Sequence, residues 1–261
     1  MKTVFLHGFL GSPRAWHAVV DALLLDASYT LSPWLPGHGH VPWFSGASFL
    51  DAIDALAGEL PNAPSVLVGY SLGARLALGL CARHPSRVAR AVLIGVNPGL
   101  RDPAARAARL ADDTALANTL EGARDLNAFV ERWERQPLFA SQEALADSVR
   151  QARRRERQGH TPEGIAWALR VLSLGAMPCW DDLSLIPSRV DLITGSRDEK
   201  FTQLARGLAA TSSRSTHHEI EGAGHDVVLE APHRVARILS DCLGMTHAVP
   251  DTSLLPHSEA S

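Results

Sequence analysis

The feature that most constrains this chain is the pentapeptide Gly-Tyr-Ser-Leu-Gly at residues 69–73. The run before it, SVLV, is apolar and β-rich like a buried strand, and the run after it, ARLALGLCAR, is helical in character. A strand-to-helix turn of the GxSxG type holds its serine in a strained conformation, and the flanking glycines avoid collisions with neighbouring backbone. The pattern predicts that Ser71 projects from a sheet at the positive end of a helix, where it can act as a nucleophile or base.

Strand-like and helical segments alternate along much of the chain. Apolar runs bounded by glycine and proline are separated by helical runs, which is typical of a mostly parallel sheet covered by helices on both faces. Besides the segment around Ser71, we expect strands or strand–loop units over residues 2–6, 28–39, 88–99, 188–201 and 216–225, and helices over 16–25 and 232–244.

The sequence pattern changes between about residues 100 and 175. Ala, Arg, Leu and Glu recur there at helical spacing without a β-branched run, so we expect a helical insertion that caps the sheet. Residues 1–243 are therefore predicted to form a single α/β domain that includes this cap. Residues 244–261 show no periodicity and are predicted to be a disordered tail.

The composition excludes several classes of partner. Of the 261 residues, 46% are hydrophobic and 20% are charged, an ordinary balance for a globule with a sizeable core. The net charge of −3 argues against a nucleic acid or an anionic membrane as partner. Three scattered cysteines without a CxxC pair indicate a reduced compartment, and no run is apolar enough for a secretory signal or a membrane helix. We expect a cytoplasmic monomer or small homo-oligomer that acts on a small molecule.

A serine of this kind needs a base and an acid that orients the base, in the chain order Ser, Asp or Glu, His. Asp198 follows the run VDLIT and His225 follows the run HHEI, so both lie at carboxyl ends of strands, the edge where Ser71 lies. Glu199 is a second candidate for the acid, although the loop position favours Asp198. The order predicts the α/β-hydrolase fold, with His225 bonded to Ser71 through one ring nitrogen and to Asp198 through the other.

Two backbone N–H groups are predicted to complete the site. In this fold the loop after the first strand supplies one N–H to an oxyanion, and the residue after the serine supplies the other. The loop HGFLGS and the GxSxG turn therefore nominate the N–H groups of Phe9 and Leu72. His38 and His40 in LPGHGH have no nearby Asp-His or Cys partner, so we expect no metal site and no cofactor.

Taken together, HGFLGS, LPGHG, GYSLGAR, DEKF and GAGH resemble the motifs of one α/β-hydrolase family, the 2-succinyl-6-hydroxy-2,4-cyclohexadiene-1-carboxylate synthases of menaquinone biosynthesis. The helical insertion adds to the likeness through NPGLRDPAARAAR, ERWERQPLFAS and ALRVLSLGAMPCW. The resemblance covers residues 4–239. Trp34 stands where the family usually has Asp before LPGHG, and the antiparallel strands that often precede HGF are missing.

The resemblance implies a lyase. That family removes a proton beside the succinyl ketone of 2-succinyl-5-enolpyruvyl-6-hydroxy-3-cyclohexene-1-carboxylate and expels the enolpyruvyl group as pyruvate, a 2,5-elimination. Ser71, deprotonated by His225, would be the base, and the N–H groups of Phe9 and Leu72 would hold the developing enolate oxygen. No acyl-enzyme is needed.

The substrate implied in this way carries three carboxylates, which the planar fork of arginine binds bidentately. Arg75 lies about one helical turn after Ser71 and therefore on the same face. The resemblance also implies substrate contacts by Tyr70, Arg109, Trp133 and Arg157, with Arg153, Arg154 and Arg155 competing for the role of Arg157. Because residues 98–177 hold twelve Arg, no Lys and eleven Asp or Glu, most arginines there are expected to be solvated or paired.

Two other functions fit the same scaffold. A serine esterase or carbon–carbon bond hydrolase would use the same triad and predicts an apolar pocket, so Arg75 and Arg109 aimed inward would count against it. A non-catalytic ligand-binding sensor could keep the triad and would bind a partner in a ligand-dependent way without turnover.

Overall fold

The computed structural model describes residues 1–40 and 47–245, and within them a parallel sheet of six strands runs in the order β2-β1-β3-β4-β5-β6. The strands are β1 (Thr3–Leu6), β2 (Thr30–Leu31), β3 (Ser65–Tyr70), β4 (Val88–Ile94), β5 (Arg189–Gly195) and β6 (Ser215–Ile220). The predicted α/β-hydrolase fold class is confirmed. Most of the predicted tail, residues 246–261, lies outside the described residues.

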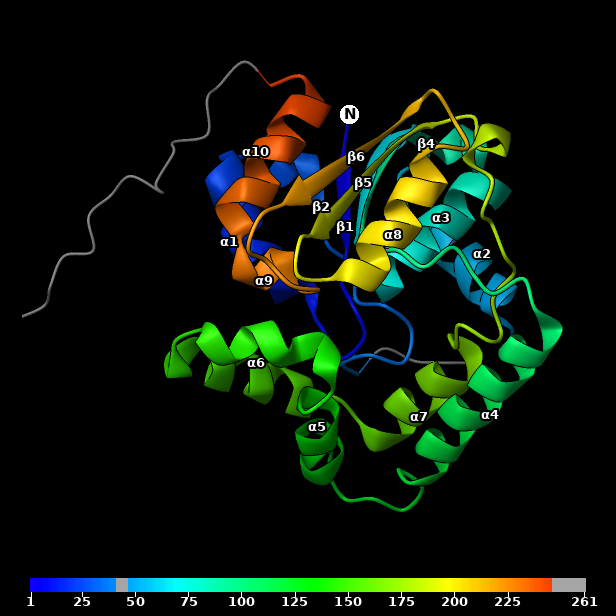
Figure 1. Cartoon of the computed structure of the whole chain (residues 1–261), viewed down its shortest axis with the longest axis vertical. Helices are drawn as coiled ribbons and strands as arrows, with labels where there is room; N and C mark the ends of the chain where they lie inside the picture. Colours follow the sequence, from blue (N-terminus) through cyan, green and yellow to red (C-terminus); the bar gives the residue numbers. More distant parts are fainter. Residues whose placement is uncertain (41–46, 246–261) are drawn as a thin grey trace, which may run out of the picture.

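Helices cover both faces of the sheet (Figure 1). One face carries α1 (His17–Leu23), α9 (Val227–Glu230) and α10 (Pro232–Leu243), and the other carries α2 (Phe49–Glu59), α3 (Leu72–Arg83) and α8 (Glu199–Ala209). Each face buries its own hydrophobic cluster, as expected for a sheet that is apolar on both sides. None of the helices that the structure describes is long and apolar enough to cross a membrane.

The segment between residues 100 and 175 is helical and lies below the carboxyl ends of the strands in Figure 1. It consists of α4 (Pro103–Asn118), α5 (Asn127–Glu134), a 3₁₀ helix (Pro137–Ala144), α6 (Asp147–Gln158) and α7 (Pro162–Val171). A third hydrophobic cluster joins α4, α5 and α7 to Leu10, which lies in the loop after β1. The cap therefore packs directly on a loop of the sheet that the sequence assigns to the active site.

Strand β3 sets the position of Ser71. All six of its residues are buried between β1 and β4, with Gly69 paired to Leu6 on one side and to Leu93 on the other. Burying a Val or Leu side chain in this way contributes about 1.5–3 kcal/mol, so the strand is firmly held. The turn that follows it is consequently presented at a fixed place on the sheet edge.

Gly73 allows the first turn of α3 to pass over the end of β1. A Cβ at this position would lie 2.1 Å from the carbonyl oxygen of Leu6, so the helix or the strand would have to move. We expect Gly73→Ala to lower the free energy of unfolding by about 1–3 kcal/mol, the usual cost of overpacking, as measured by urea denaturation. The matched control is Gly207→Ala in α8, where a Cβ would meet nothing within 4 Å. The control should be neutral or stabilising by about 0.5–1 kcal/mol; a loss as large as that of Gly73→Ala would refute the explanation.

Candidate active site

Ser71 occupies the strained turn that its motif predicts. It is the N-cap of α3 with φ of 50° and ψ of −105°, a region that residues with a side chain seldom adopt. Its backbone is held on both sides, because its N–H donates to the carbonyl of Ile94 at 2.8 Å and its own carbonyl accepts from the N–H of Arg75 at 3.1 Å. The hydroxyl is thereby fixed at the N-terminus of α3, where the helix dipole favours negative charge on it.

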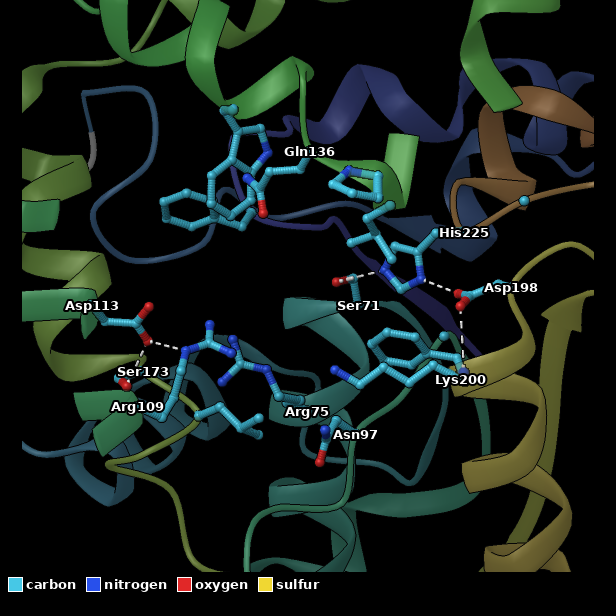
Figure 2. A pocket seen from close by; sticks show the side chains of 18 of the residues that line it. Ser71, Arg75, Asn97, Arg109, Asp113, Gln136, Ser173, Asp198, Lys200 and His225 are labelled. Carbon is cyan, nitrogen blue, oxygen red and sulfur yellow. Dashed lines mark hydrogen bonds and ion pairs between the residues drawn. The ribbon is translucent and has the colours of Figure 1, made fainter. Parts of the chain in front are cut away.

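His225 and Asp198 lie beside Ser71, each in the loop after its strand (Figure 2). The Nε2 of His225 is 3.3 Å from the Oγ of Ser71, and its Nδ1 is 2.6 Å from the carboxylate of Asp198. Both side chains are buried, so this short contact is shielded from water. With the Nδ1–H donating to Asp198, Nε2 is left to accept the proton of Ser71.

The carboxylate that contacts His225 belongs to Asp198 and not to its neighbour Glu199. Asp198 caps α8 by accepting from the N–H of Phe201, which fixes its carboxylate toward His225. Glu199 is exposed and bonds Gln203 along the outer face of the same helix. The ring of Phe201 lies 4.4 Å from the ring of His225 and limits its rotation.

The loop after β1 brings the second predicted N–H to the site. Its Leu10 has φ of 57°, and its N–H donates to the Nε2 of His38 at 3.2 Å, while the N–H of Gly11 donates back to Gly8. The N–H of Phe9 lies just before these two N–H groups, both of which donate within the protein. The N–H of Leu72 is the first in α3 and so has no partner within the helix. Phe9 and Ser71 line the same cavity, as an oxyanion site requires.

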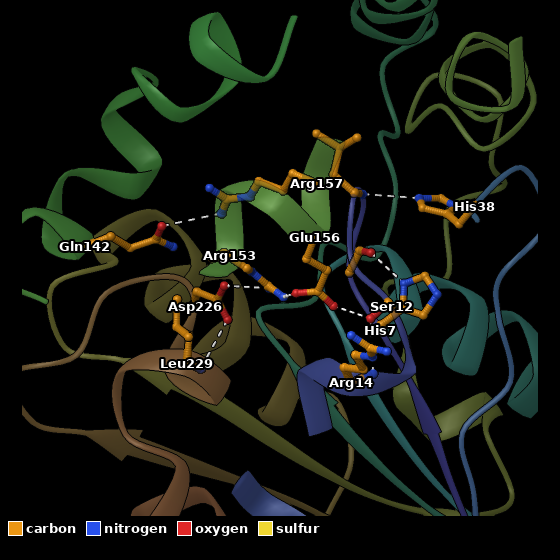
Figure 3. Close-up of polar contacts among 12 residues, drawn as sticks. His7, Ser12, Arg14, His38, Gln142, Arg153, Glu156, Arg157, Asp226 and Leu229 are labelled. Atoms are coloured by element: carbon orange, nitrogen blue, oxygen red, sulfur yellow. Dashed lines mark hydrogen bonds and ion pairs between the residues drawn. The ribbon is translucent and has the colours of Figure 1, made fainter. Parts of the chain in front are cut away.

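Two buried histidines, His7 and His38, hold this loop through hydrogen bonds that require their rings to be neutral (Figure 3). The Nδ1–H of His7 donates to Gly8 and its Nε2 accepts from the N–H of Leu35; His38 donates to Pro36 and accepts from Leu10 in the same way. A second proton on either ring would remove an acceptor. Burial lowers the pKa of His7 to about 3 and that of His38 well below its ordinary value.

A cavity of about 780 Å³ extends from Ser71 between the sheet edge and the cap. Most of the predicted site residues line it, namely Phe9, Ser71, Arg75, Arg109, Trp133, Asp198 and His225. The structure therefore brings together residues from four loops of the sheet, from helix α3 and from two cap helices. Its wall also includes polar residues that the sequence did not nominate, namely Asn97, Asp113, Gln136, Ser173, Arg197 and Lys200.

Arg75 lines this cavity beside Arg109 (Figure 2). Its Nη1 donates to the carbonyl of Leu172 at 2.7 Å, and no ion pair forms with it among the described residues. Burial, together with the nearby charge of Arg109, lowers the pKa of Arg75 to about 9. A cation that is desolvated without a counter-charge indicates a place for an anion.

Arg109 lines the cavity but already has a carboxylate partner. Its Nε donates to Asp113 at 2.8 Å, and Ser173 donates to the same carboxylate at 2.7 Å. Trp133 also lines the cavity, with its ring 4.9 Å from that of Phe9. The sequence carried a signal of this pairing, because Asp113 follows Arg109 by four residues in a helical run, a spacing that brings two side chains together.

Tyr70 and Arg157 do not line this cavity. Arg157 is buried against Glu134, at 2.9 Å, and Gln142. Tyr70 lies under Gly8 with its ring 5.5 Å from that of His225, and burial raises its pKa well above the ordinary value. The two residues meet Ser71 only across a separate pocket of about 30 Å³. Arg157 also lines a cavity of about 410 Å³ within the cap, and Ser71 is not among the residues that line that cavity.

Arg153 ties the cap to the sheet, and the other candidates for the role of Arg157 do not (Figure 3). It is buried, and it pairs with Asp226 at 2.9 Å and with Glu156 at 2.8 Å. Burial disfavours its charge, but the two carboxylates outweigh that effect and raise its pKa. Glu156 in turn accepts from Ser12 of the loop after β1. Two further candidates, Arg154 and Arg155, are exposed.

Neither the LPGHGH loop with His38 nor the cluster around His218 is suited to hold a metal ion. Both ring nitrogens of His38 are used by backbone groups. Within the described residues, Asp191, His218 and Cys242 place ligand atoms within 4.8 Å of one another, but Arg90 already contacts the carboxylate of Asp191 at 2.6 Å. The guanidinium takes the place that a cation would occupy.

Comparison with known proteins gives consistent matches over this chain. The model of the alpha/beta hydrolase family matches residues 3–238. A putative 2-succinyl-6-hydroxy-2,4-cyclohexadiene-1-carboxylate synthase of Bacillus subtilis (strain 168) is 33% identical over 92% of this chain and 89% of its own. The chloroplastic protein PHYLLO of Arabidopsis thaliana is 31% identical over 94% of this chain, which spans only 15% of that protein. The solved structure of MenH from S. aureus matches with a TM-score of 0.87 and 28% identity, covering 94% of this chain and 93% of the other.

The neutral histidines make stability fall in acid. Their pKa is lower in the folded chain than the ordinary value of about 6.5, so the unfolded chain takes up protons first as pH falls below that value. We expect each to reduce the free energy of unfolding by about 2 kcal/mol between pH 6.5 and 5. Urea denaturation of His38→Gln, whose side chain accepts without titrating, should show a flatter pH dependence over this window. Exposed His233 is the control, and His233→Gln should keep the wild-type slope; three equal slopes would contradict the neutral-histidine explanation.

Proposed function

Because this chain belongs to the 2-succinyl-6-hydroxy-2,4-cyclohexadiene-1-carboxylate synthase family of α/β hydrolases, we propose that it eliminates pyruvate from 2-succinyl-5-enolpyruvyl-6-hydroxy-3-cyclohexene-1-carboxylate. The product is the cyclohexadiene after which the family is named, and the pathway is menaquinone biosynthesis. The observation that carries the proposal is that one cavity is lined both by the Ser71–His225 pair and by Arg75, a cation that has no ion pair among the described residues.

The reaction is an elimination across the ring double bond. Removal of the proton beside the succinyl ketone sends its electron pair toward the ketone oxygen and into the ring. The existing double bond shifts by one position, and the bond from the ring to the enolpyruvyl oxygen breaks. The enolpyruvate that leaves takes up a proton and becomes pyruvate, so the ring gains one double bond and no oxidant is needed.

Ser71, His225 and Asp198 supply the base for this step. His225 takes the proton of Ser71 through Nε2, and the Ser71 oxyanion removes the substrate proton. Asp198 stabilises the imidazolium through the 2.6 Å contact with Nδ1. His225 then holds a proton within reach of the leaving enolpyruvate. Proton transfers of this kind each contribute about 10²–10⁴-fold to a rate.

The N–H groups of Phe9 and Leu72 hold the enolate oxygen that develops on the ketone. Donors that are already oriented need no reorganisation when the charge appears, which makes them effective in a site shielded from water. The neutral histidines and the strained Ser71 turn both support this fixed geometry. The same two donors would serve an ester's tetrahedral intermediate.

A serine hydrolase is the second candidate function. The contact between Ser71 and His225 suits nucleophilic attack as well as proton abstraction, and that geometry favours no single reaction. The polar and charged wall of the cavity favours the elimination, because a neutral ester gives Arg75 no partner. The cytoplasmic location and the oligomeric state stay predictions.

Release of pyruvate from the enolpyruvyl tricarboxylate decides between the two functions. We expect rapid release, followed by coupling to lactate dehydrogenase, and only slow cleavage of p-nitrophenyl acetate by the same preparation. Ser71→Ala should lower kcat for pyruvate release by 10³-fold or more, as loss of a base in a hydrogen-bonded triad does. Strong ester cleavage without pyruvate release would overturn the lyase proposal.

Arg75 tests whether the cavity recognises carboxylates. Arg75→Ala should raise KM for the tricarboxylate by about 10- to 100-fold, the value of a charge-assisted hydrogen bond, and should change ester cleavage much less. Arg75→Lys, which keeps the charge but loses the planar fork, is the matched variant and should recover part of the loss. Equal losses on the tricarboxylate and the ester would show that Arg75 only supports the fold.

A further inference from the structure

Only some of the charged side chains on the cavity wall are paired with an opposite charge. Four cations line it: Arg75, Arg109, Arg197 and Lys200. Among the described residues, only Arg109 has a carboxylate partner within ion-pair distance. The two carboxylates of the wall are already engaged, Asp113 with Arg109 and Asp198 with His225. The wall therefore holds an excess of positive charge that no side chain of the wall neutralises.

Lys200 stands out among these cations because the chain contains only one other lysine, Lys2. It is the second residue of α8 and follows Asp198 by two positions. Its Nζ lies 5.7 Å from the ring of Phe201, the ring that packs on His225. Figure 2 shows Lys200 reaching from the Asp198 wall into the cavity, toward the side where Arg75 and Asn97 lie.

Asn97 adds a third donor to this side of the cavity. It is buried, and its Oδ1 accepts from the N–H of Gly99 at 3.0 Å. Its amide NH₂ is therefore the polar group left for a ligand. A guanidinium, an ammonium and an amide NH₂ on one wall are all donors, a set that suits a carboxylate and repels a cation.

We infer that Lys200 binds a substrate carboxylate together with Arg75 and Asn97, and so contributes to the selection of a multiply charged substrate. The inference rests on the proposed function for the identity of the substrate. Lys200 would then provide part of the carboxylate recognition that the family resemblance assigns to Arg157, which is buried outside the main cavity and is paired with Glu134. The position of Lys200 on the helix that Asp198 caps places the bound carboxylate close to the Ser71–His225 pair.

Kinetics of pyruvate release test this assignment. Lys200→Gln should raise KM for the tricarboxylate about 10- to 100-fold, as expected for one charge-assisted contact, with kcat changed less than threefold. Lys200→Arg should restore part of the affinity. Lys2→Gln, which removes the only other lysine side chain from a position that does not line the cavity, should behave as wild type. An unchanged KM in Lys200→Gln would overturn the inference while leaving the proposed function intact.

Labelling of the wild-type chain gives a readout that does not depend on turnover. Acetic anhydride modifies both lysines, and mass spectrometry of peptides separates Lys2 from Lys200. Citrate, a tricarboxylate probe, should slow acetylation of Lys200 at least fivefold and leave that of Lys2 unchanged. Equal rates with and without citrate would refute the assignment. Protection by citrate without pyruvate release would instead show that the carboxylate site is real and that the proposed reaction is wrong.

Discussion

The contact on which the site depends is the close approach of the first turn of α3 to the end of β1. It requires glycine at position 73, because a Cβ would meet the Leu6 carbonyl at 2.1 Å, and glycine at position 69, where a Cβ would meet Gly73 at 2.4 Å. This approach fixes Ser71 in its strained conformation and sets the N–H of Leu72 beside the loop that carries Phe9. One backbone contact thus positions both the hydroxyl-bearing residue Ser71 and the N–H of Leu72, the two groups to which the proposed mechanism gives roles.

The surrounding buried polar groups keep that geometry in place. His7 and His38 each donate one hydrogen bond to loop backbone and accept another from it. Only a neutral ring can do both, so the loop depends on these histidines being neutral. Arg153 links cap helix α6 to Asp226, the residue after His225, and through Glu156 to Ser12. The cap is therefore connected to two of the loops that form the site. Removing one partner of such a buried set would leave a desolvated charge, which is costly.

The distribution of charge in the cavity bears on which ligand it can hold. Like charges that lie close together, as those of Arg75 and Arg109 do, are tolerated in part because Asp113 neutralises one of them. The remaining cations are desolvated or placed at the wall without a counter-charge. A substrate with several carboxylates supplies the missing negative charge, and a neutral ester does not.

The sequence by itself determined the sheet, the turn at Ser71 and the choice of His225 among twelve histidines. These follow from local rules, because glycine spacing, strand periodicity and chain order act over short stretches. It did not separate Asp198 from Glu199 without appeal to loop position and did not predict helix α2, and it placed Arg157 in a cavity that Arg157 does not line. Only the tertiary structure showed that Arg157 is buried against Glu134, a residue of another cap helix, and that Lys200 lines the cavity. An arginine in a mixed-charge helix has several acidic residues within reach, and its partner depends on how the helices pack, which no local pattern encodes.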